Sequence, residues 1–199
     1  MKQVRAFMQS EGAAWLERNE SKLPPVIDPV IEAIKSADIS PHHTDVIEVG
    51  CANGWRLERM KRLYNTRGIG VDPAAPRNVP HLFQGGADSL PAATDEYDFV
   101  IYGFCLYLVD REDLFKVAAE GDRVLRNFGH IVIYDFLPDY PHKVPYKHLD
   151  GLFSYKMDYA NLWLGSPAYS VVHRQLWPEQ GEAVTILQKD INRGWPLDE

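Results

Sequence analysis

The chain has few cysteines and no long apolar run, and both absences narrow what it can be. Two cysteines, Cys51 and Cys105, stand among 199 residues, which argues against a disulfide-stapled secreted domain and favours a reducing, cytoplasmic setting. No apolar stretch approaches the roughly 20 residues that a membrane span needs. The first residues also lack the apolar segment of a signal peptide. We therefore expect neither a membrane anchor nor secretion.

Basic residues are scarce as well. The chain carries 21 Lys and Arg against 28 Asp and Glu, a formal net charge of −7, and it shows no basic stripe of the kind that marks a nucleic-acid footprint. His, Cys and acidic residues do not recur at metal-ligand spacings, and the pair His42-His43 fits a solvated loop. We therefore expect no nucleic acid, membrane or metal ion as a partner, while the oligomeric state stays open.

The stretch from Asp45 to Tyr64 organises the chain. Its apolar, β-branched start at residues 46–49 is typical of a strand that is buried on both faces. Gly50 and Gly54 then bracket a tight turn, and the segment after Trp55 places its apolar residues on one face at helical spacing. A strand, a glycine turn and a helix in this order form a small-ligand crevice at the carboxyl end of a parallel strand.

The glycine spacing distinguishes between two kinds of ligand. A dinucleotide fingerprint needs Gly-x-Gly-x-x-Gly, whereas this loop runs Glu48-Val49-Gly50-Cys51-Ala52-Asn53-Gly54. The loop resembles motif I of the class I S-adenosylmethionine-dependent methyltransferases, with Ala52 where the second glycine commonly stands. The resemblance implies a set of cofactor-binding residues in this loop: Glu48, Gly50, Cys51, Asn53 and Gly54.

Later segments continue the resemblance in the family's order. A second buried strand ends in Asp72, which the resemblance places on the ribose hydroxyls, with Pro73 beside the adenine. The loop at 86–91 resembles the acidic loop that binds the adenine amino group, here through Asp88 and Ser89. Residues 96–104 match the family's fourth strand, and residues 123–133 match the helix end and strand that follow. The end of the fourth strand adds three implied cofactor contacts: Tyr102, Gly103 and Phe104.

Two helices are expected ahead of the first strand. They cover residues 4–20 and 25–37, on either side of the Leu23-Pro24-Pro25 break. In the methyltransferase resemblance such helices cover the cofactor, so Trp15 and Arg18 could reach the carboxylate at its methionine end. It is equally open that Trp15 packs in the core and Arg18 is solvated.

The predicted fold class is α/β: a Rossmann-like three-layer sandwich whose seven-stranded, mostly parallel sheet ends in an antiparallel hairpin. Alternating residues at 169–177, a turn at 178–181 and a second run at 182–189 predict that hairpin. We expect one methyltransferase domain over 1–199. Within it, residues 1–40 form a helical cover, 41–136 the cofactor-binding core, 137–170 a substrate-side insertion and 171–190 the terminal hairpin.

Residues 137–170 are rich in aromatic residues, Pro and His. Because this segment leaves the fifth strand at its carboxyl end, we expect it to roof the acceptor site. His148 is the candidate base, since the unperturbed pKa of His lies nearest neutrality; a surface histidine is the alternative. Four tyrosines are the candidate acceptor contacts, although core packing stays open for such residues: Tyr107, Tyr146, Tyr155 and Tyr159.

The resemblance implies a methyltransferase that uses S-adenosylmethionine and acts on a small-molecule or glycan-like acceptor, at an oxygen atom. Alignment of acceptor and methyl group can supply about 7–11 kcal/mol of the barrier, so no fixed catalytic motif is required. The Asp/Asn-Pro-Pro-Tyr/Phe motif of nitrogen methylation is absent after the fourth strand. Two alternatives stay open: a catalytically silent S-adenosylmethionine-binding partner or sensor, and a nicotinamide-dependent oxidoreductase.

Overall fold

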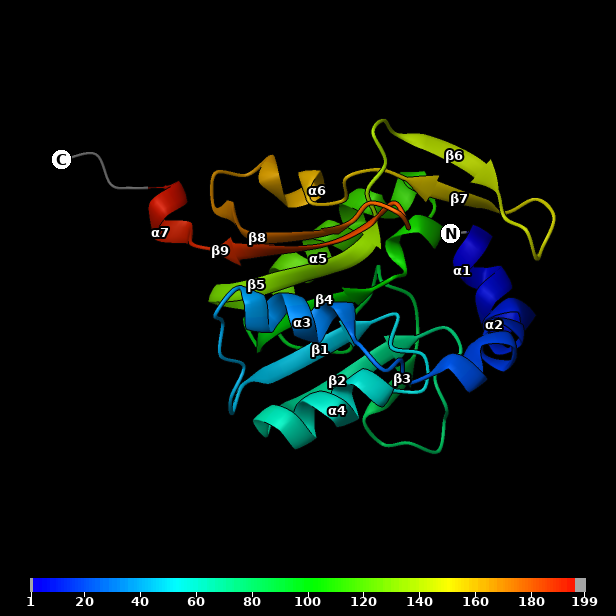
Figure 1. Ribbon diagram of the computed structural model, residues 1–199, viewed down its shortest axis with the longest axis horizontal. Coiled ribbons are helices and arrows are strands. Elements are labelled where there is room, and N and C mark those ends of the chain that lie inside the picture. Colours follow the sequence, from blue (N-terminus) through cyan, green and yellow to red (C-terminus); the bar gives the residue numbers. More distant parts are fainter. Residues whose placement is uncertain (1, 196–199) are drawn as a thin grey trace.

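The computed structural model describes residues 2–195 and has three layers (Figure 1). A seven-stranded sheet lies in the middle, in the strand order β3-β2-β1-β4-β5-β9-β8. Its strands are β1 (Asp45–Val49), β2 (Arg67–Asp72), β3 (Leu82–Gln84), β4 (Tyr97–Gly103), β5 (Leu125–Phe136), β8 (Tyr169–Trp177) and β9 (Glu182–Lys189). A separate two-stranded sheet consists of β6 (His142–Pro145) and β7 (Phe153–Lys156).

Helices cover both faces of the main sheet. The α-helices are α1 (Lys2–Ala6), α2 (Gly12–Asn19), α3 (Pro29–Ser36), α4 (Trp55–Tyr64), α5 (Leu114–Val124), α6 (Asn161–Leu164) and α7 (Ile191–Gly194). Short turns complete the order: the π-helical η1 (Phe7–Glu11) and the 3-10 turns η2 (Glu20–Lys22), η3 (Leu106–Leu108) and η4 (Arg111–Asp113). α3 and α4 pack on one face of the sheet, and α5 and α6 pack on the other.

The predicted fold class is confirmed. β1 pairs in parallel with β2 and β4, and β5 continues the parallel set beside β4. β9 lies antiparallel to β5, and β8 pairs antiparallel with β9 at the edge. The terminal hairpin therefore follows five parallel strands, as expected.

Successive side chains of the central strands point to opposite faces of the sheet, so the core has two halves. Val46 faces the α3–α4 side, whereas Ile47 faces the α5 side, and both side chains are fully buried. Phe99 and Val100 on β4 divide in the same way. Because successive side chains pack on opposite faces of the sheet, β1 and β4 are held from both sides.

The second predicted helix starts later than expected. The expectation was residues 25–37, whereas α3 begins at Pro29. The Asp28 side chain accepts a hydrogen bond from Val30 N at 3.0 Å, and Pro29 occupies the first helical position. The N-cap therefore decides the boundary, and the prediction of Pro25 was wrong.

The expected helix over residues 4–20 is interrupted. α1 and α2 are joined by η1, the π-helical turn, so one residue is added within the helical run. The buried Gln3 attaches this run to the rest of the chain. Its side chain donates to Leu108 O at 2.6 Å and accepts from Phe153 N at 2.6 Å. The helical cover and the β6–β7 hairpin therefore lie next to each other (Figure 1).

Three further properties concern the described residues. Both Cys51 and Cys105 are free thiols. No cluster of three or more His, Cys, Asp or Glu side chains within residues 2–195 is arranged to hold a metal ion. No helix in that range has both the length and the apolar character needed to cross a membrane.

Lys189 closes the junction between α5 and β5 from the end of β9. Its side chain is only 7% exposed. Nζ donates to Asp122 O at 2.8 Å and to Leu125 O at 3.0 Å, and it pairs with the Asp122 carboxylate at 3.2 Å. A cation at the C-terminus of a helix also stabilises the helix dipole.

We predict that Lys189→Met lowers the free energy of unfolding by about 1–3 kcal/mol, because a buried and a partly buried carbonyl lose a charged donor. Urea unfolding followed by circular dichroism measures this change. Lys35→Met is the matched control, because Lys35 is exposed and pairs with Glu32 in its own helix, and it should leave the midpoint unchanged. Equal midpoints for Lys189→Met and wild type would contradict the role of Lys189.

Candidate active site

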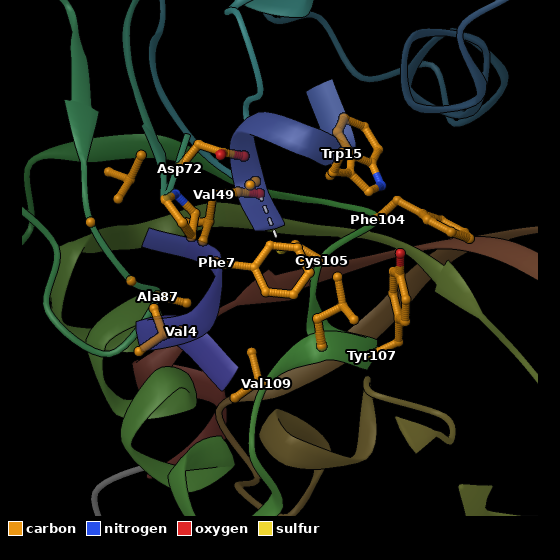
Figure 2. A pocket seen from close by; sticks show the side chains of 18 residues that line it. Val4, Phe7, Trp15, Val49, Asp72, Ala87, Phe104, Cys105, Tyr107 and Val109 are labelled. Atoms are coloured by element: carbon orange, nitrogen blue, oxygen red, sulfur yellow. Dashed lines mark hydrogen bonds between the residues drawn. The ribbon is translucent and has the colours of Figure 1, made fainter. Parts of the chain in front are cut away.

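A cavity opens at the carboxyl ends of the parallel strands, and its empty space, including the part open to solvent, is about 800 Å³. Eighteen residues line it, from the N-terminal helical run and from the segments after β1, β2, β3 and β4: Val4, Phe7, Gly12, Trp15, Val49, Gly50, Val71, Asp72, Pro73, Gly85, Gly86, Ala87, Gly103, Phe104, Cys105, Tyr107, Leu108 and Val109. Figure 2 shows their arrangement.

Asp72 lies at one end of the cavity. Its carboxylate accepts hydrogen bonds from Ala52 N at 3.0 Å and from Ala74 N at 2.7 Å, one on each oxygen. Each carboxylate oxygen has two lone pairs, so a lone pair remains on each oxygen for a vicinal diol. Burial raises the pKa of Asp72, and the two backbone N–H groups counteract that rise. Asp72 is therefore positioned to accept from a pair of ligand hydroxyls.

Small residues allow separate backbone segments to approach each other closely around this cavity. Gly50 has φ +78°, and a Cβ at this position would meet Cys105 Cβ at 2.5 Å. A Cβ on Gly12 would meet Ala74 Cβ at 2.9 Å. The Gly50 contact holds the loop after β1 against the loop after β4, and the Gly12 contact seats the helical cover on the loop after β2.

Aromatic side chains form the other end of the cavity. Figure 2 shows Trp15, Phe104 and Tyr107 on the side opposite Asp72, with Phe7 between the two ends. The Phe104 and Tyr107 rings lie 5.2 Å apart, and the Phe136 ring packs behind both at 4.9 and 5.2 Å. We call Trp15, Phe104 and Tyr107 the aromatic end.

The Tyr107 hydroxyl is a polar group within this apolar end. Burial raises the pKa of the hydroxyl, whereas the Trp15 side chain acts in the opposite direction. The phenol is therefore neutral at physiological pH. A neutral phenol carries one O–H donor, so the Tyr107 hydroxyl can donate a hydrogen bond.

Asp135, at the end of β5, lies behind the aromatic end. Its carboxylate accepts from Leu106 N at 2.9 Å, Tyr107 N at 3.3 Å and Phe136 N at 2.8 Å. The side chain is 2% exposed. Burial raises the pKa of Asp135 to about 7, although the three N–H groups lower it.

Several predicted site residues do line the cavity: Trp15, Gly50, Asp72, Pro73, Gly103, Phe104 and Tyr107. Glu48 does not, because it lies beneath the cavity on the α3–α4 side. It is 1% exposed and pairs with Arg56, which also binds Asp28 at 3.0 Å. A Cβ on Gly103 would meet Arg56 Nη1 at 2.7 Å. Glu48 therefore supports the cavity floor from behind, and direct contact with the cofactor stays a prediction.

The remaining loop residues support the turn. Cys51 is 1% exposed, and its Sγ lies 2.5 Å from where a Cβ on Gly70 would stand. The Asn53 side chain accepts from Trp55 N at 3.3 Å, and Gly54 is the N-cap of α4 with φ +81°. These three residues shape the loop around Gly50 without lining the cavity.

Three further predicted cofactor contacts, Tyr102, Asp88 and Ser89, are not among the described residues that line the cavity. Tyr102 is fully buried on the α5 side, where its hydroxyl donates to Val117 O at 3.2 Å. Asp88 pairs with Lys116 at 3.1 Å. Its neighbour Ser89 is exposed, whereas Gly86 and Ala87 from the same loop line the cavity. The adenine role of Asp88 stays a prediction.

Of the predicted acceptor and base residues, Tyr146, His148 and Tyr155 belong to the β6–β7 hairpin, and Tyr159 follows it. Tyr146 is buried and donates to the Glu11 carboxylate at 2.9 Å, and Arg18 binds the same carboxylate. The exposed His148 packs edge-on against Tyr146 with ring centres 5.4 Å apart. Tyr159, 2% exposed, donates to Tyr155 O at 2.6 Å. None of these five side chains, Arg18, Tyr146, His148, Tyr155 and Tyr159, is among the described residues that line the cavity.

Sequence reasoning missed part of the cavity. Val4, Phe7 and Gly12 line it from the helical run, and Leu108 and Val109 line it from the segment after β4. The π-helical turn shifts the face of the run by one residue, so regular helical spacing from Trp15 did not reveal Phe7. Asp135 was also missed, although an acid after four apolar strand residues is a signal that could have identified it.

Comparisons with known proteins agree with this geometry. A family described as a methyltransferase domain matches residues 47–133. The 1,6-didemethyltoxoflavin-N1-methyltransferase of Burkholderia thailandensis superposes with a TM-score of 0.70 at 14% identity, over 94% of this chain and 89% of that one. A S-adenosylmethionine-dependent methyltransferase of Methanosarcina mazei gives 0.62 at 14% identity, over 82% and 98%.

A third similar structure is a putative methyltransferase of Haloferax volcanii in complex with the Trm112 methyltransferase activator. It superposes with a TM-score of 0.67 at 14% identity, over 89% of this chain and 95% of that one. No curated protein matches the chain. At these identities the structural likeness shows the fold, and the family match adds a methyltransferase domain that runs from β1 to β5.

The chain contains a methyltransferase domain over residues 47–133, on the fold that the similar solved methyltransferases share. Its cofactor is therefore S-adenosylmethionine, and the nicotinamide-dependent alternative is set aside. The cavity of this methyltransferase fits that cofactor: a carboxylate with free lone pairs stands at one end, and apolar surfaces such as Pro73 and Ala87 stand beside it.

We predict that Asp72→Ala weakens the binding of S-adenosylmethionine at least about tenfold, because hydrogen bonds to a charged acceptor are lost. Isothermal titration calorimetry measures the affinity. Asp98→Asn is the control, since Asp98 also accepts a backbone N–H, from Asp45 at 2.8 Å, but lies at the start of β4. Unchanged affinity in Asp72→Ala would show that Asp72 stabilises the turn after β2 and does not bind the cofactor.

A second prediction concerns pH. Because the pKa of Asp135 is raised from 3.8 to about 7, the folded state binds more protons than the unfolded state between these values. The free energy of unfolding contributed by this group therefore falls as pH rises from about 4 to about 7, by up to about 1.4 kcal/mol per pH unit. Asp135→Asn should show a flatter pH dependence in urea unfolding, and parallel curves for the two proteins would contradict the assignment.

Proposed function

We propose that this methyltransferase transfers a methyl group to a small-molecule acceptor held at the aromatic end, and that the receiving atom is an oxygen. One observation carries the proposal: a single cavity joins the Asp72 carboxylate to the aromatic end, with Phe7 between them. When bound, the sulfonium cofactor supplies an electrophilic methyl group. The residues of the chain then have to orient the acceptor and exclude water.

The aromatic end suits a flat, uncharged acceptor. Phe104 and the aromatic part of Tyr107 offer ring faces and edges, and Phe136 fixes both rings from behind. Rings packed in this way lose little further freedom when a ligand stacks on them. The Tyr107 hydroxyl can donate to an oxygen of the acceptor and so fix the orientation of the acceptor ring.

The residues that line the cavity indicate what kind of acceptor hydroxyl can react there. Among the eighteen described lining residues Asp72 is the sole carboxylate, and it stands at the opposite end from Tyr107. Burial raises the pKa of the Cys105 thiol well above its usual value, so Cys105 is a neutral group. A hydroxyl that ionises readily, as in a phenol or an enol, needs no protein base. We therefore favour such an acceptor over a sugar hydroxyl.

A less acidic, glycan-like hydroxyl would require a base, and His148 stays the candidate for that role. Its ring lies against Tyr146, which Glu11 links to the helical cover. The hairpin carrying His148 is therefore attached to the segment that lines the cavity.

We predict that the protein methylates phenolic or enolic acceptors in preference to sugar alcohols, read as a mass gain of one methyl group after incubation with S-adenosylmethionine. Tyr107→Phe should lower kcat/KM about tenfold or more, since one orienting hydrogen bond is lost, while calorimetry shows unchanged cofactor affinity. Transfer to sugars alone would contradict the proposed acceptor class. Cofactor binding without transfer to any member of the panel would instead favour a silent binding protein.

The same assay decides the role of His148. His148→Gln should leave the methylation of an ionised phenol unchanged. If His148 acts as the base, turnover should fall by about a hundredfold or more. Cofactor affinity, measured in parallel, should be unaffected in either case.

A further inference from the structure

The η3 turn carries one wall of the aromatic end. Cys105 precedes the turn and Tyr107 lies within it, and both side chains line the cavity. Cys105 Sγ donates to Val49 O at 3.3 Å, so the wall contacts the end of β1 as well. A short 3-10 turn of this kind has few hydrogen bonds of its own to fix it in place.

Asp135 supplies the missing hydrogen bonds. One oxygen of its carboxylate accepts from two successive backbone N–H groups of the turn, those of Leu106 and Tyr107. The other oxygen accepts from Phe136 N. Phe136 also packs its ring on Tyr107, at 5.2 Å. Residues at the end of β5 therefore contact both the backbone and the side chain of Tyr107.

A buried carboxylate is an energetically costly way to fix a turn. No basic side chain within residues 2–195 forms an ion pair with Asp135, and the carboxylate is 2% exposed. Burying a charge without a counter-ion destabilises the folded state. An uncharged Asn or Ser could accept from a turn at lower cost, whereas a carboxylate binds two N–H groups more strongly.

We propose that Asp135 is a positioning residue, whose carboxylate holds the η3 turn so that Tyr107 and Cys105 form a fixed wall for the acceptor. This inference rests on the proposed function for the location of the acceptor. It concerns a residue that touches neither acceptor nor cofactor and acts through the backbone of the turn.

The two free cysteines provide a test that needs no acceptor. Cys105 lies in the wall, whereas Cys51 is 1% exposed beneath the loop after β1. Each thiol is labelled with methyl methanethiosulfonate, and the labelling rates of the two residues are read by peptide mass spectrometry. In Asp135→Asn the rate at Cys105 should rise about tenfold or more, because at least one hydrogen bond to a charged acceptor is lost. The rate at Cys51 should stay at the wild-type value.

Asp98→Asn is the matched control, because it removes a carboxylate that accepts a backbone N–H at the opposite end of β4, and it should change neither rate. Equal acceleration at both cysteines in Asp135→Asn would show general loosening and overturn the proposal. Unchanged rates at both would overturn it as well.

A second measurement covers the case in which Asp135→Asn does not fold. Asp135→Glu keeps the charge and displaces the carboxylate, and hydrogen exchange of the peptide spanning residues 104–109 reports on the Leu106 and Tyr107 amides directly. Exchange should accelerate in that peptide and not in β1. Wild-type exchange throughout would contradict the proposal. If labelling behaves as expected but no acceptor is methylated, the proposed function fails and the positioning role stands.

Discussion

The site depends on one close contact, between the loop after β1 and the loop after β4. Gly50 stands where a Cβ would lie 2.5 Å from Cys105 Cβ, and its own φ of +78° favours glycine. Because β1 pairs directly with β4, this contact fixes the separation of the two strand ends. Any side chain at position 50 would push the Phe104–Tyr107 wall away from the Asp72 end.

Buried charge is concentrated around the same strand ends. Glu48, Arg56 and Asp28 form an ion-paired group beneath Gly103. Asp72 and Asp135 instead receive backbone N–H groups, and burial raises the pKa of both. Carboxylates in such positions cost stability, and here each of them fixes a loop that lines the cavity. This distribution is typical of a site in which precise placement is obtained at the expense of folding free energy.

Much of the fold could be predicted because its signals are local. Each central strand is a short apolar run that ends at a glycine or an acid, and the order of these runs identified the sheet. The side chains at the strand ends were harder to predict, because the face of a strand that meets the cofactor depends on neighbours. Tyr102 and Phe104 are two residues apart, yet Tyr102 is bonded to α5 and Phe104 lines the cavity.

The N-terminal run shows a second limit. Its π-helical turn places Phe7 in the cavity, and that extra residue leaves no mark in the pattern of apolar residues. The partners of charged residues were also beyond local reasoning: Asp88 meets Lys116 on α5, and Arg18 meets Glu11. Such long-range or alternative pairings decide whether a side chain faces the ligand or another residue.

The central claim is that one cavity has a ribose end at Asp72 and an acceptor end at Trp15, Phe104 and Tyr107. The most direct measurement is a crystal structure with S-adenosylhomocysteine bound. Our account predicts both ribose hydroxyls on the Asp72 carboxylate and the sulfur atom directed toward Phe104. A nucleoside seated on the aromatic end, or a sulfur atom directed away from Phe104, would contradict it.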